Sequence, residues 1–200
     1  MLTIFHAPRT RSARILWLCE EMGVPYQLEA ADLRNPSPAF VATNPLNSLP
    51  ALRDGDAVMT ESIAIMLYVM ERYGPTPLVL KAGEPGHADY LQYLIFGEAG
   101  LGMNGNPVIA ARFMAPEGEK ENWSTRNCLD RFTRRIEIVE QKLADRPYIA
   151  GGRFTAADIS VGYALGLADF VGAGTLPPRC ARYLETLQAR PAFQRAAARA

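Results

Sequence analysis

The chain has 200 residues, of which 48% are hydrophobic, and its 21 basic side chains are balanced by 21 acidic ones. This size and composition suit either one large or two small domains with a substantial buried core. The balanced charge argues against a nucleic-acid or an anionic-membrane partner, and no stretch approaches the ~18 apolar residues of a transmembrane helix.

Three further features restrict the class of protein to which the chain can belong: its N-terminus, its cysteines and its histidines. The apolar run within Met1–Pro8 is too short for a signal peptide, and arginines follow it instead of preceding it. The three cysteines are far apart and lack CxxC spacing, so neither a disulfide framework nor a zinc site is predicted. His6 and His87 have no second ligand at metal spacing, so we expect no metal site and interpret both as structural or exposed. These features indicate a cytoplasmic protein.

Residues 1–75 alternate between strand-like and helix-like patterns. Leu2–Phe5 is a short apolar run that suits a buried strand, and the apolar spacing is helical from Ser12 to a stop at Gly23. Tyr26–Ala30 then alternates like a second strand. A β-α-β unit of this length predicts a parallel pair of strands joined by a right-handed crossover.

A short helix, a hairpin and a longer helix follow. The polar, proline-rich stretch 35–38 leads into a helical segment around Phe40. Two short strands at 50–53 and 57–59 flank an Asp-Gly turn, which is a hairpin signal, and 62–73 is strongly helical before a Gly-Pro stop. The predicted order of this half is therefore β-α-β-α-β-β-α.

The second half has no convincing strand. A proline- and glycine-rich linker at 79–86 separates residues 1–78 from residues 87–200, which carry only helical patterns. An α/β half followed by an all-α half predicts two domains. The helical segments are 90–114, 122–143, 156–170, 179–189 and a short helix from Pro191.

Pro50 enters a strand, which is unusual because proline cannot donate to the ladder. One explanation is a cis Leu49–Pro50 bond, which would turn the Leu49 N–H and C=O away from the sheet and leave them free for a ligand backbone. The alternative is a trans proline at an edge strand. Spacing alone favours the trans form, because only about 5–6% of X-Pro bonds are cis in folded proteins.

Glu61 and Ser62 open the helix at 62–73. Helix capping alone is enough to explain Ser62, and Thr60 is an equally good cap. The same N-terminus also suits a ligand, since its free N–H groups bind a carboxylate and the Ser62 hydroxyl adds a donor. Glu61 could accept from an ammonium group, so an amino-acid-like ligand would fit.

Four stretches carry a family resemblance, and they are Arg14–Tyr26, Asn44–Leu52, Asp54–Met66 and Phe154–Ser160. Their patterns, order and spacing resemble the cytosolic glutathione transferases of the bacterial type. The resemblance spans nearly the whole chain. It implies a thioredoxin-like α/β N-terminal domain that binds glutathione, followed by an all-α helical C-terminal domain.

The last of these stretches resembles the family's capping box and hydrophobic staple. Thr155 would cap the helix, Asp158 would reach back, and Phe154 would pack on Ile159. Its role would be structural, with a contribution of roughly 1 kcal/mol or more.

The resemblance also assigns roles in the first domain. Leu49 would pair through its backbone with the cysteinyl part of glutathione, and Glu61 and Ser62 would hold the γ-glutamyl end. Many relatives have a lysine where Ser48 stands, so another basic side chain would meet the glycyl carboxylate, with Arg9, Arg11 and Arg34 as candidates. The remaining residues expected around glutathione are Asn47, Ser48 and Pro50.

The resemblance places the group that activates the thiol in the loop 8–14. A thiol with a pKa near 8.5 is a poor nucleophile, and a hydroxyl that donates to sulfur stabilises the thiolate. This loop has no tyrosine and no cysteine, which argues against the classes that depend on them. Thr10 is the first candidate because relatives have serine there, and Ser12 is the second. Ser12 is equally well explained as the N-cap of the first helix. Arg9 and Arg11 would add positive charge beside the thiolate.

The electrophile pocket is expected between the domains. The residues that we expect to line it are Tyr93, Phe96, Asn104 and Arg112 on the first long helix of the second domain. Aromatic residues at helical spacing are also common in cores. Four glycines between 97 and 105 loosen this helix and could permit close approach of a partner helix or a ligand.

The resemblance therefore implies a glutathione transferase, a detoxification enzyme that conjugates glutathione to a small hydrophobic electrophile. Glutathione would be a co-substrate, with no metal or organic prosthetic group, and the family is usually homodimeric. One alternative is a glutathione-dependent disulfide-bond reductase or peroxidase. Another is a non-catalytic binding protein with the same fold.

Overall fold

The computed structural model describes residues 1–199, which divide into two compact units. The first unit contains Met1–Leu78 together with the C-terminal segment from Gln188, and the second contains Val79–Leu187. The expected domains were residues 1–78 and 87–200, with a linker at 79–86. In the structure, the segment from Gln188 belongs to the same compact unit as residues 1–78.

The first unit is built on a four-stranded sheet with the order β2-β1-β3-β4. Its strands are β1 (Leu2–His6), β2 (Gln27–Ala30), β3 (Ala51–Asp54) and β4 (Ala57–Thr60). β1 and β2 are parallel, as the crossover length predicted, and the other two pairs are antiparallel. The β3–β4 hairpin and the order β-α-β-α-β-β-α are confirmed.

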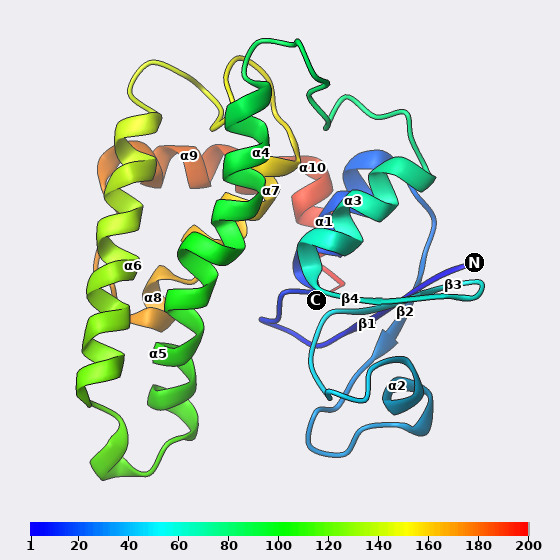
Figure 1. The fold of residues 1–200 in the computed structure, drawn as a ribbon, viewed down its shortest axis with the longest axis horizontal. Helices are drawn as coiled ribbons and strands as arrows, with labels where there is room; N and C mark the ends of the chain where they lie inside the picture. The colour runs from blue at the N-terminus through cyan, green and yellow to red at the C-terminus, as the bar shows by residue number, and fades with distance from the viewer. Residues whose placement is uncertain (200) are drawn as a thin grey trace. The chain divides into compact units, whose positions relative to one another are not determined.

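Helices cover both faces of this sheet (Figure 1). α1 (Ala13–Met22) and α3 (Ser62–Arg72) lie on one face, and α2 (Pro38–Thr43) lies on the other. α1 ends where expected, because Gly23 adopts φ 66° and donates its N–H to the Cys19 carbonyl. On the α2 side, the Phe40 ring packs 5.4 Å from the Phe5 ring.

The C-terminal helix α10 (Pro191–Ala197) packs against α1 (Figure 1). The Phe193 ring meets the Trp17 ring edge-on at 4.9 Å. Arg190 donates to both carboxylate oxygens of Glu21 at 2.6 and 2.8 Å. Local periodicity cannot detect these partners, since about 170 residues separate them along the chain.

The regular secondary structure of the second unit is helical, apart from one isolated bridge between Tyr148 and Gly151. The expected helix at 90–114 is divided into three pieces, with a π-helical segment in the middle. The elements are α4 (His87–Ile95), the π-helix η1 (Phe96–Gly102), α5 (Met103–Met114), the 3-10 turn η2 (Glu117–Glu119), α6 (Trp123–Lys142), α7 (Ala156–Leu165), α8 (Ala168–Val171) and α9 (Pro178–Gln188).

Gly97 permits the close packing of the π-helical segment against α7. A Cβ on Gly97 would collide with the backbone and hydroxyl of Ser160 on α7, so only glycine fits this approach. The Ser160 hydroxyl also donates to the Leu94 carbonyl at 2.8 Å. The glycine-rich stretch therefore serves the approach of a neighbouring helix, which was one of its two expected uses.

α7 is anchored by the buried carboxylate of Asp158. As the capping box predicted, Asp158 reaches back to accept from the Thr155 N–H at 2.7 Å. It also accepts from the Ile149 N–H at 2.8 Å and from the Tyr183 hydroxyl at 2.7 Å. One side chain thus joins the start of α7, the preceding loop and α9.

α4 and α6 are joined by an ion pair near their ends. Lys142 and Arg146 donate to the two oxygens of Asp89 at 2.7 and 2.9 Å. Burial acts to raise the pKa of Asp89, but the two hydrogen-bonded cations outweigh it and hold that pKa below its ordinary value. Within residues 1–199, no helix is both long and apolar enough to cross a membrane.

Candidate functional site

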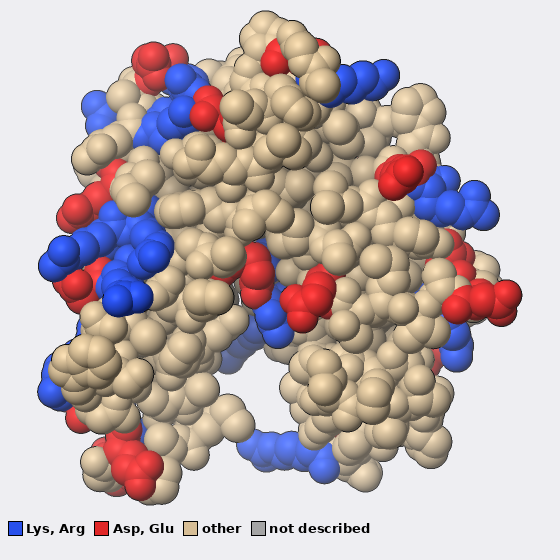
Figure 2. Space-filling view, viewed as in Figure 1, with Lys and Arg blue, Asp and Glu red and all other residues tan. Residues whose placement is uncertain are grey.

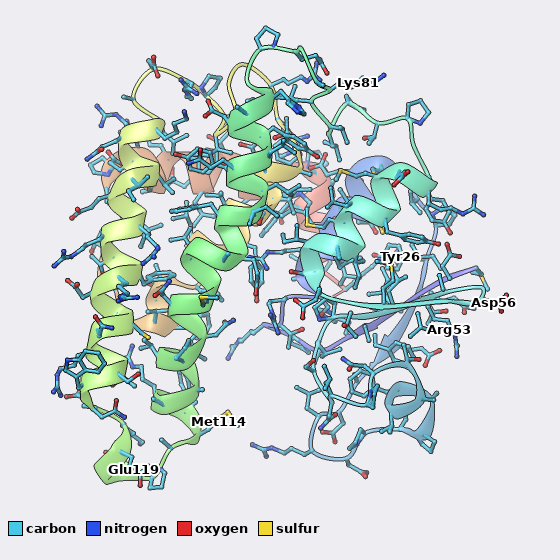
Figure 3. The ribbon with its side chains drawn as sticks, in the orientation of Figure 1. Tyr26, Arg53, Asp56, Lys81, Met114 and Glu119 are labelled. Carbon is cyan, nitrogen blue, oxygen red and sulfur yellow. The ribbon has the colours of Figure 1, made fainter. Side chains whose placement is uncertain are left out.

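Strand register brings three loops of the first unit to the same end of the sheet. Phe5 pairs with Ala51, and Ala51 pairs with Thr60. The loop after β1, the segment before β3 and the segment after β4 therefore meet there. The β3–β4 turn, marked by Asp56 in Figure 3, lies at the other end. The predicted glutathione-site residues are carried by these three segments, which we call the sheet-end site.

The loop after β1 holds Thr10 and Ser12 in direct contact. Their hydroxyl oxygens lie 2.6 Å apart, and the Thr10 hydroxyl donates to the Ala7 carbonyl at 2.7 Å. Thr10 is partly exposed, whereas Ser12 is completely buried. Only Thr10 of the two can therefore reach a ligand without movement of the loop.

Ser12 occupies the N-cap position of α1, but its side chain makes no capping hydrogen bond. Its hydroxyl instead lies 2.7 Å from Nδ1 of His6, which is buried at the end of β1. Burial lowers the pKa of His6, which favours the neutral ring. Sequence reasoning gave His6 only a structural or exposed role. The sequence feature that could have indicated a role for His6 in the site is its position at the end of a predicted buried strand, directly before the loop 8–14.

Arg9 and Arg11 flank Thr10 in the same turn. Arg9 is exposed with a left-handed backbone, φ 63°, and Arg11 is partly buried. The turn is closed by the Ala13 N–H, which donates to the Thr10 carbonyl at 3.1 Å. Both cations thus belong to the loop that carries the candidate activating hydroxyl.

The second loop presents Leu49 and Pro50. The Leu49–Pro50 bond is cis, so the less frequent of the two expected forms is present. Leu49 is 4% exposed, and within residues 1–199 neither its N–H nor its C=O has a backbone hydrogen-bond partner. Both groups are therefore available to an extended ligand backbone.

Asn44 organises this loop, a role that the sequence did not reveal. Its buried side chain donates to the Ser48 carbonyl at 2.6 Å and accepts from the Leu46 N–H at 3.0 Å. Asn47 has a left-handed backbone, φ 50°, and its amide donates to the Leu33 carbonyl at 2.8 Å. Asn47 and Ser48 lie in the loop as expected.

The third segment is the entrance to α3. Glu61 is exposed with φ 67° and makes no capping hydrogen bond. A positive φ at a non-glycine residue is strained, and such residues concentrate at functional sites. Ser62, the first residue of α3, accepts a hydrogen bond from Nη1 of the fully buried Arg14 at 3.0 Å. The Ser62 proton therefore remains free to be donated to an anion, beside the positive end of the α3 dipole.

The residues expected to form the electrophile pocket fall into separate groups within the helical unit. The Tyr93 and Phe96 rings meet edge-on at 5.6 Å, with Tyr93 buried. Asn104 is buried and donates to the Gly100 carbonyl at 2.6 Å, next to the π-helical segment. These contacts do not test the expected electrophile pocket, which stays a prediction.

Arg112 lies farther along α5, where it donates to the Phe170 carbonyl at 3.2 Å. It lines a cavity of about 260 Å³ whose apolar walls come from Val108, Leu129 and Val171. The exposed Met114 and Glu119, both labelled in Figure 3, mark this end of the helical unit. Arg112 thus belongs to a different group from the two aromatic rings.

Charge and donor chemistry fit a small-molecule site better than a polyanion site. On the face shown in Figure 2, basic and acidic side chains are interspersed, without a broad area of one sign. Among residues 1–199 no three His, Cys, Asp or Glu side chains are placed to hold a metal ion. The sheet-end site offers hydroxyls, backbone groups, arginines and one carboxylate.

Comparison with known families matches both units. Residues 1–71 match the family description "Glutathione S-transferase, N-terminal domain", and residues 111–186 match "Glutathione S-transferase, C-terminal domain". The first match contains all three segments of the sheet-end site.

Individual relatives agree with this result. "Glutathione S-transferase 3" of Schizosaccharomyces pombe is 29% identical over 79% of this chain and 70% of its own length. "Glutathione S-transferase 3" of Zea mays is 26% identical over 92% of this chain and 87% of its own. The solved structure of a glutathione transferase from Methylococcus capsulatus str. Bath is 26% identical, with a TM-score of 0.85 over 100% of this chain and 98% of that one.

Proposed function

The chain belongs to the glutathione S-transferase family, and we propose that it binds glutathione at the sheet-end site, activates the thiol and conjugates it to a small hydrophobic electrophile. The observation that carries this proposal is the convergence of three features at one end of the sheet. A partly exposed hydroxyl, an unpaired backbone segment and a helix N-terminus with a free hydroxyl proton lie there together.

Each part of glutathione has a chemically matched partner at this site. The α3 N-terminus and the Ser62 hydroxyl suit the γ-glutamyl carboxylate, and the exposed Glu61 carboxylate suits its ammonium group. The Leu49 N–H and C=O suit the backbone of the cysteinyl residue. Arg9 and Arg11 suit the glycyl carboxylate, beside the loop that contains Asn47, Ser48 and Pro50.

Thr10 is the group that we assign to thiol activation. It is the exposed member of the Thr10–Ser12 pair, so its hydroxyl can donate to the sulfur and stabilise the thiolate. The thiol proton passes to solvent. The sulfur then supplies an electron pair to the electrophilic carbon, a C–S bond forms, and the leaving group departs with its bonding electrons.

An activity comparison tests this function against its alternatives. Purified protein would be supplied with reduced glutathione and one of three second substrates, which are an aryl halide, an organic hydroperoxide and a glutathione mixed disulfide. Turnover of the aryl halide that falls in Thr10→Val and persists in Thr10→Ser supports conjugation. Turnover of only the hydroperoxide or the disulfide would replace conjugation by reductase chemistry. Saturable glutathione binding without turnover of any of the three would indicate a binding protein.

A further inference from the structure

His6, Ser12 and Thr10 form a continuous hydrogen-bonded chain that ends at the candidate activating hydroxyl. The three contacts are His6 Nδ1 to Ser12 Oγ at 2.7 Å, Ser12 Oγ to Thr10 Oγ1 at 2.6 Å, and Thr10 Oγ1 to the Ala7 carbonyl at 2.7 Å. His6 is itself fixed by the sheet, because it pairs with Ala30 and its carbonyl accepts from the Ala31 N–H at 2.8 Å. The chain therefore starts on a rigid element.

Proton counting gives this chain one direction. The Ala7 carbonyl can only accept, so the single Thr10 proton is donated to it. The Ser12 proton must then be the one shared with Thr10, and Ser12 has no second proton for His6. Nδ1 of His6 must therefore carry a hydrogen and donate to Ser12. All three contacts are satisfied together only in the order His6 to Ser12 to Thr10 to Ala7.

We propose that His6 is a positioning residue for thiol activation, because its Nδ1–H fixes the direction of the Ser12 and Thr10 hydroxyls. This inference rests on the proposed function of the sheet-end site. When a thiolate arrives, the Thr10 hydroxyl turns its proton from the Ala7 carbonyl to the sulfur. The other two hydrogen bonds stay in place, and each polarises the next, which makes Thr10 a stronger donor.

The alternative role, a general base, fits the surroundings of His6 less well. Because Nδ1 already carries a hydrogen, His6 acting as a base would have to accept a proton at Nε2 and become an imidazolium. Its Nε2 is buried and has no hydrogen-bond partner within residues 1–199. A charged ring there would carry an uncompensated N–H, which burial disfavours. The thiol proton therefore leaves to solvent, and His6 stays neutral.

Without His6, the series of hydrogen bonds through Ser12 and Thr10 no longer has a fixed direction. The Ser12 oxygen would then lack a donor and could accept the Thr10 proton, which would no longer be available to the sulfur. We therefore expect His6→Leu to raise the pKa of the bound glutathione thiol by about 0.5 to 1 unit, or roughly three- to tenfold less thiolate below that pKa. His6→Asn retains an N–H donor and should restore the wild-type value.

The test is a pH titration of the ultraviolet thiolate absorbance of bound glutathione. It would be performed on the wild type, His6→Leu, His6→Asn and Ser12→Ala. His87→Leu is the matched control, because His87 also has one hydrogen bond through Nδ1, to the Leu80 carbonyl at 2.7 Å, but lies in the other unit. Glutathione affinity would be measured separately by calorimetry. If His6→Leu does not fold, His6→Asn and Ser12→Ala decide the result, with a raised pKa expected only for Ser12→Ala.

The outcomes separate this inference from the proposed function. A lowered thiol pKa in the wild type and the control, a raised one in His6→Leu and Ser12→Ala, and recovery in His6→Asn would support the positioning role. A folded His6→Leu with the wild-type pKa would overturn it, and so would a pKa that stays raised in His6→Asn. A wild type that binds no glutathione would instead refute the proposed function, and the inference with it.

Discussion

Replacement of Thr10 by valine removes a single hydroxyl group and nearly preserves the shape of the side chain. In the unliganded protein this hydroxyl donates to the Ala7 carbonyl at 2.7 Å and contacts Ser12 at 2.6 Å. Because Thr10 is partly exposed, water can replace these partners, and we expect a loss of about 1 kcal/mol in the free energy of unfolding. The fold should therefore persist, so that any loss of activity reports on the site.

The effect on the thiol follows from the strength of a charge-assisted hydrogen bond. Such a bond contributes about 1.5–3 kcal/mol, and 1.36 kcal/mol corresponds to one pKa unit. Thr10→Val should therefore raise the pKa of the bound thiol by roughly 1 to 2 units. At a pH below both values the thiolate, and with it the rate of conjugation, should fall about 10- to 100-fold.

The assay combines the thiolate absorbance titration with kcat/KM for an aryl halide over a range of pH. Thr10→Ser is the matched control, because it keeps the hydroxyl and loses only the methyl group. Glutathione affinity, measured by calorimetry, should change less than about threefold. An unchanged thiol pKa in a folded Thr10→Val would refute the role of Thr10, and so would an equal loss of activity in Thr10→Ser.

Three further predictions concern the framework that supports the site. Asp158→Ala leaves four donors without their acceptor in a buried position, so the free energy of unfolding in urea should fall by about 3–5 kcal/mol, and a loss below 1 kcal/mol would contradict the anchor role. The pKa of Asp89 lies below its unfolded value, so its stabilisation is complete above pH ~3.9 and is lost as pH falls through the folded-state pKa. The stability difference between the wild type and Asp89→Asn should therefore be constant near neutrality and shrink in acid, and a constant difference throughout would exclude this linkage. Phe193→Ala removes the edge contact with Trp17 and should lower the free energy of unfolding by about 2 kcal/mol, whereas no change in the melting curve would show that α10 adds little to the first unit.

Structural features that depend on residues close together in the sequence could be predicted. The strands and helices of the first unit follow from periodicities of two and 3.6, and the stop at Gly23 follows from its freedom to adopt a positive φ. The hydrogen bond from the Thr155 N–H to the Asp158 carboxylate depends on a three-residue spacing, so it could also be predicted. The resemblance then placed Thr10, Leu49 and Ser62 on three segments that the strand register brings to one end of the sheet.

Features that depend on long-range partners could not be predicted in this way. The Asn44 side chain orders its loop through contacts that only the folded backbone reveals. The Glu21 carboxylate binds Arg190 from the far end of the chain, a partner that no local pattern reveals. The difference in exposure between Thr10, which is partly exposed, and Ser12, which is buried, is a property of the packed loop and not of residue type.

The most direct test of the central claim is isothermal titration of the purified protein with reduced glutathione, with Ser62→Ala as the variant and oxidised glutathione as a parallel ligand. We expect saturable binding of the reduced form to the wild type. The affinity should be roughly five- to 30-fold weaker in Ser62→Ala, in line with the loss of one hydrogen bond of about 1–2 kcal/mol to a charged carboxylate. Absence of binding at millimolar concentration, or equal affinity in the two proteins, would contradict a glutathione site at the end of the sheet.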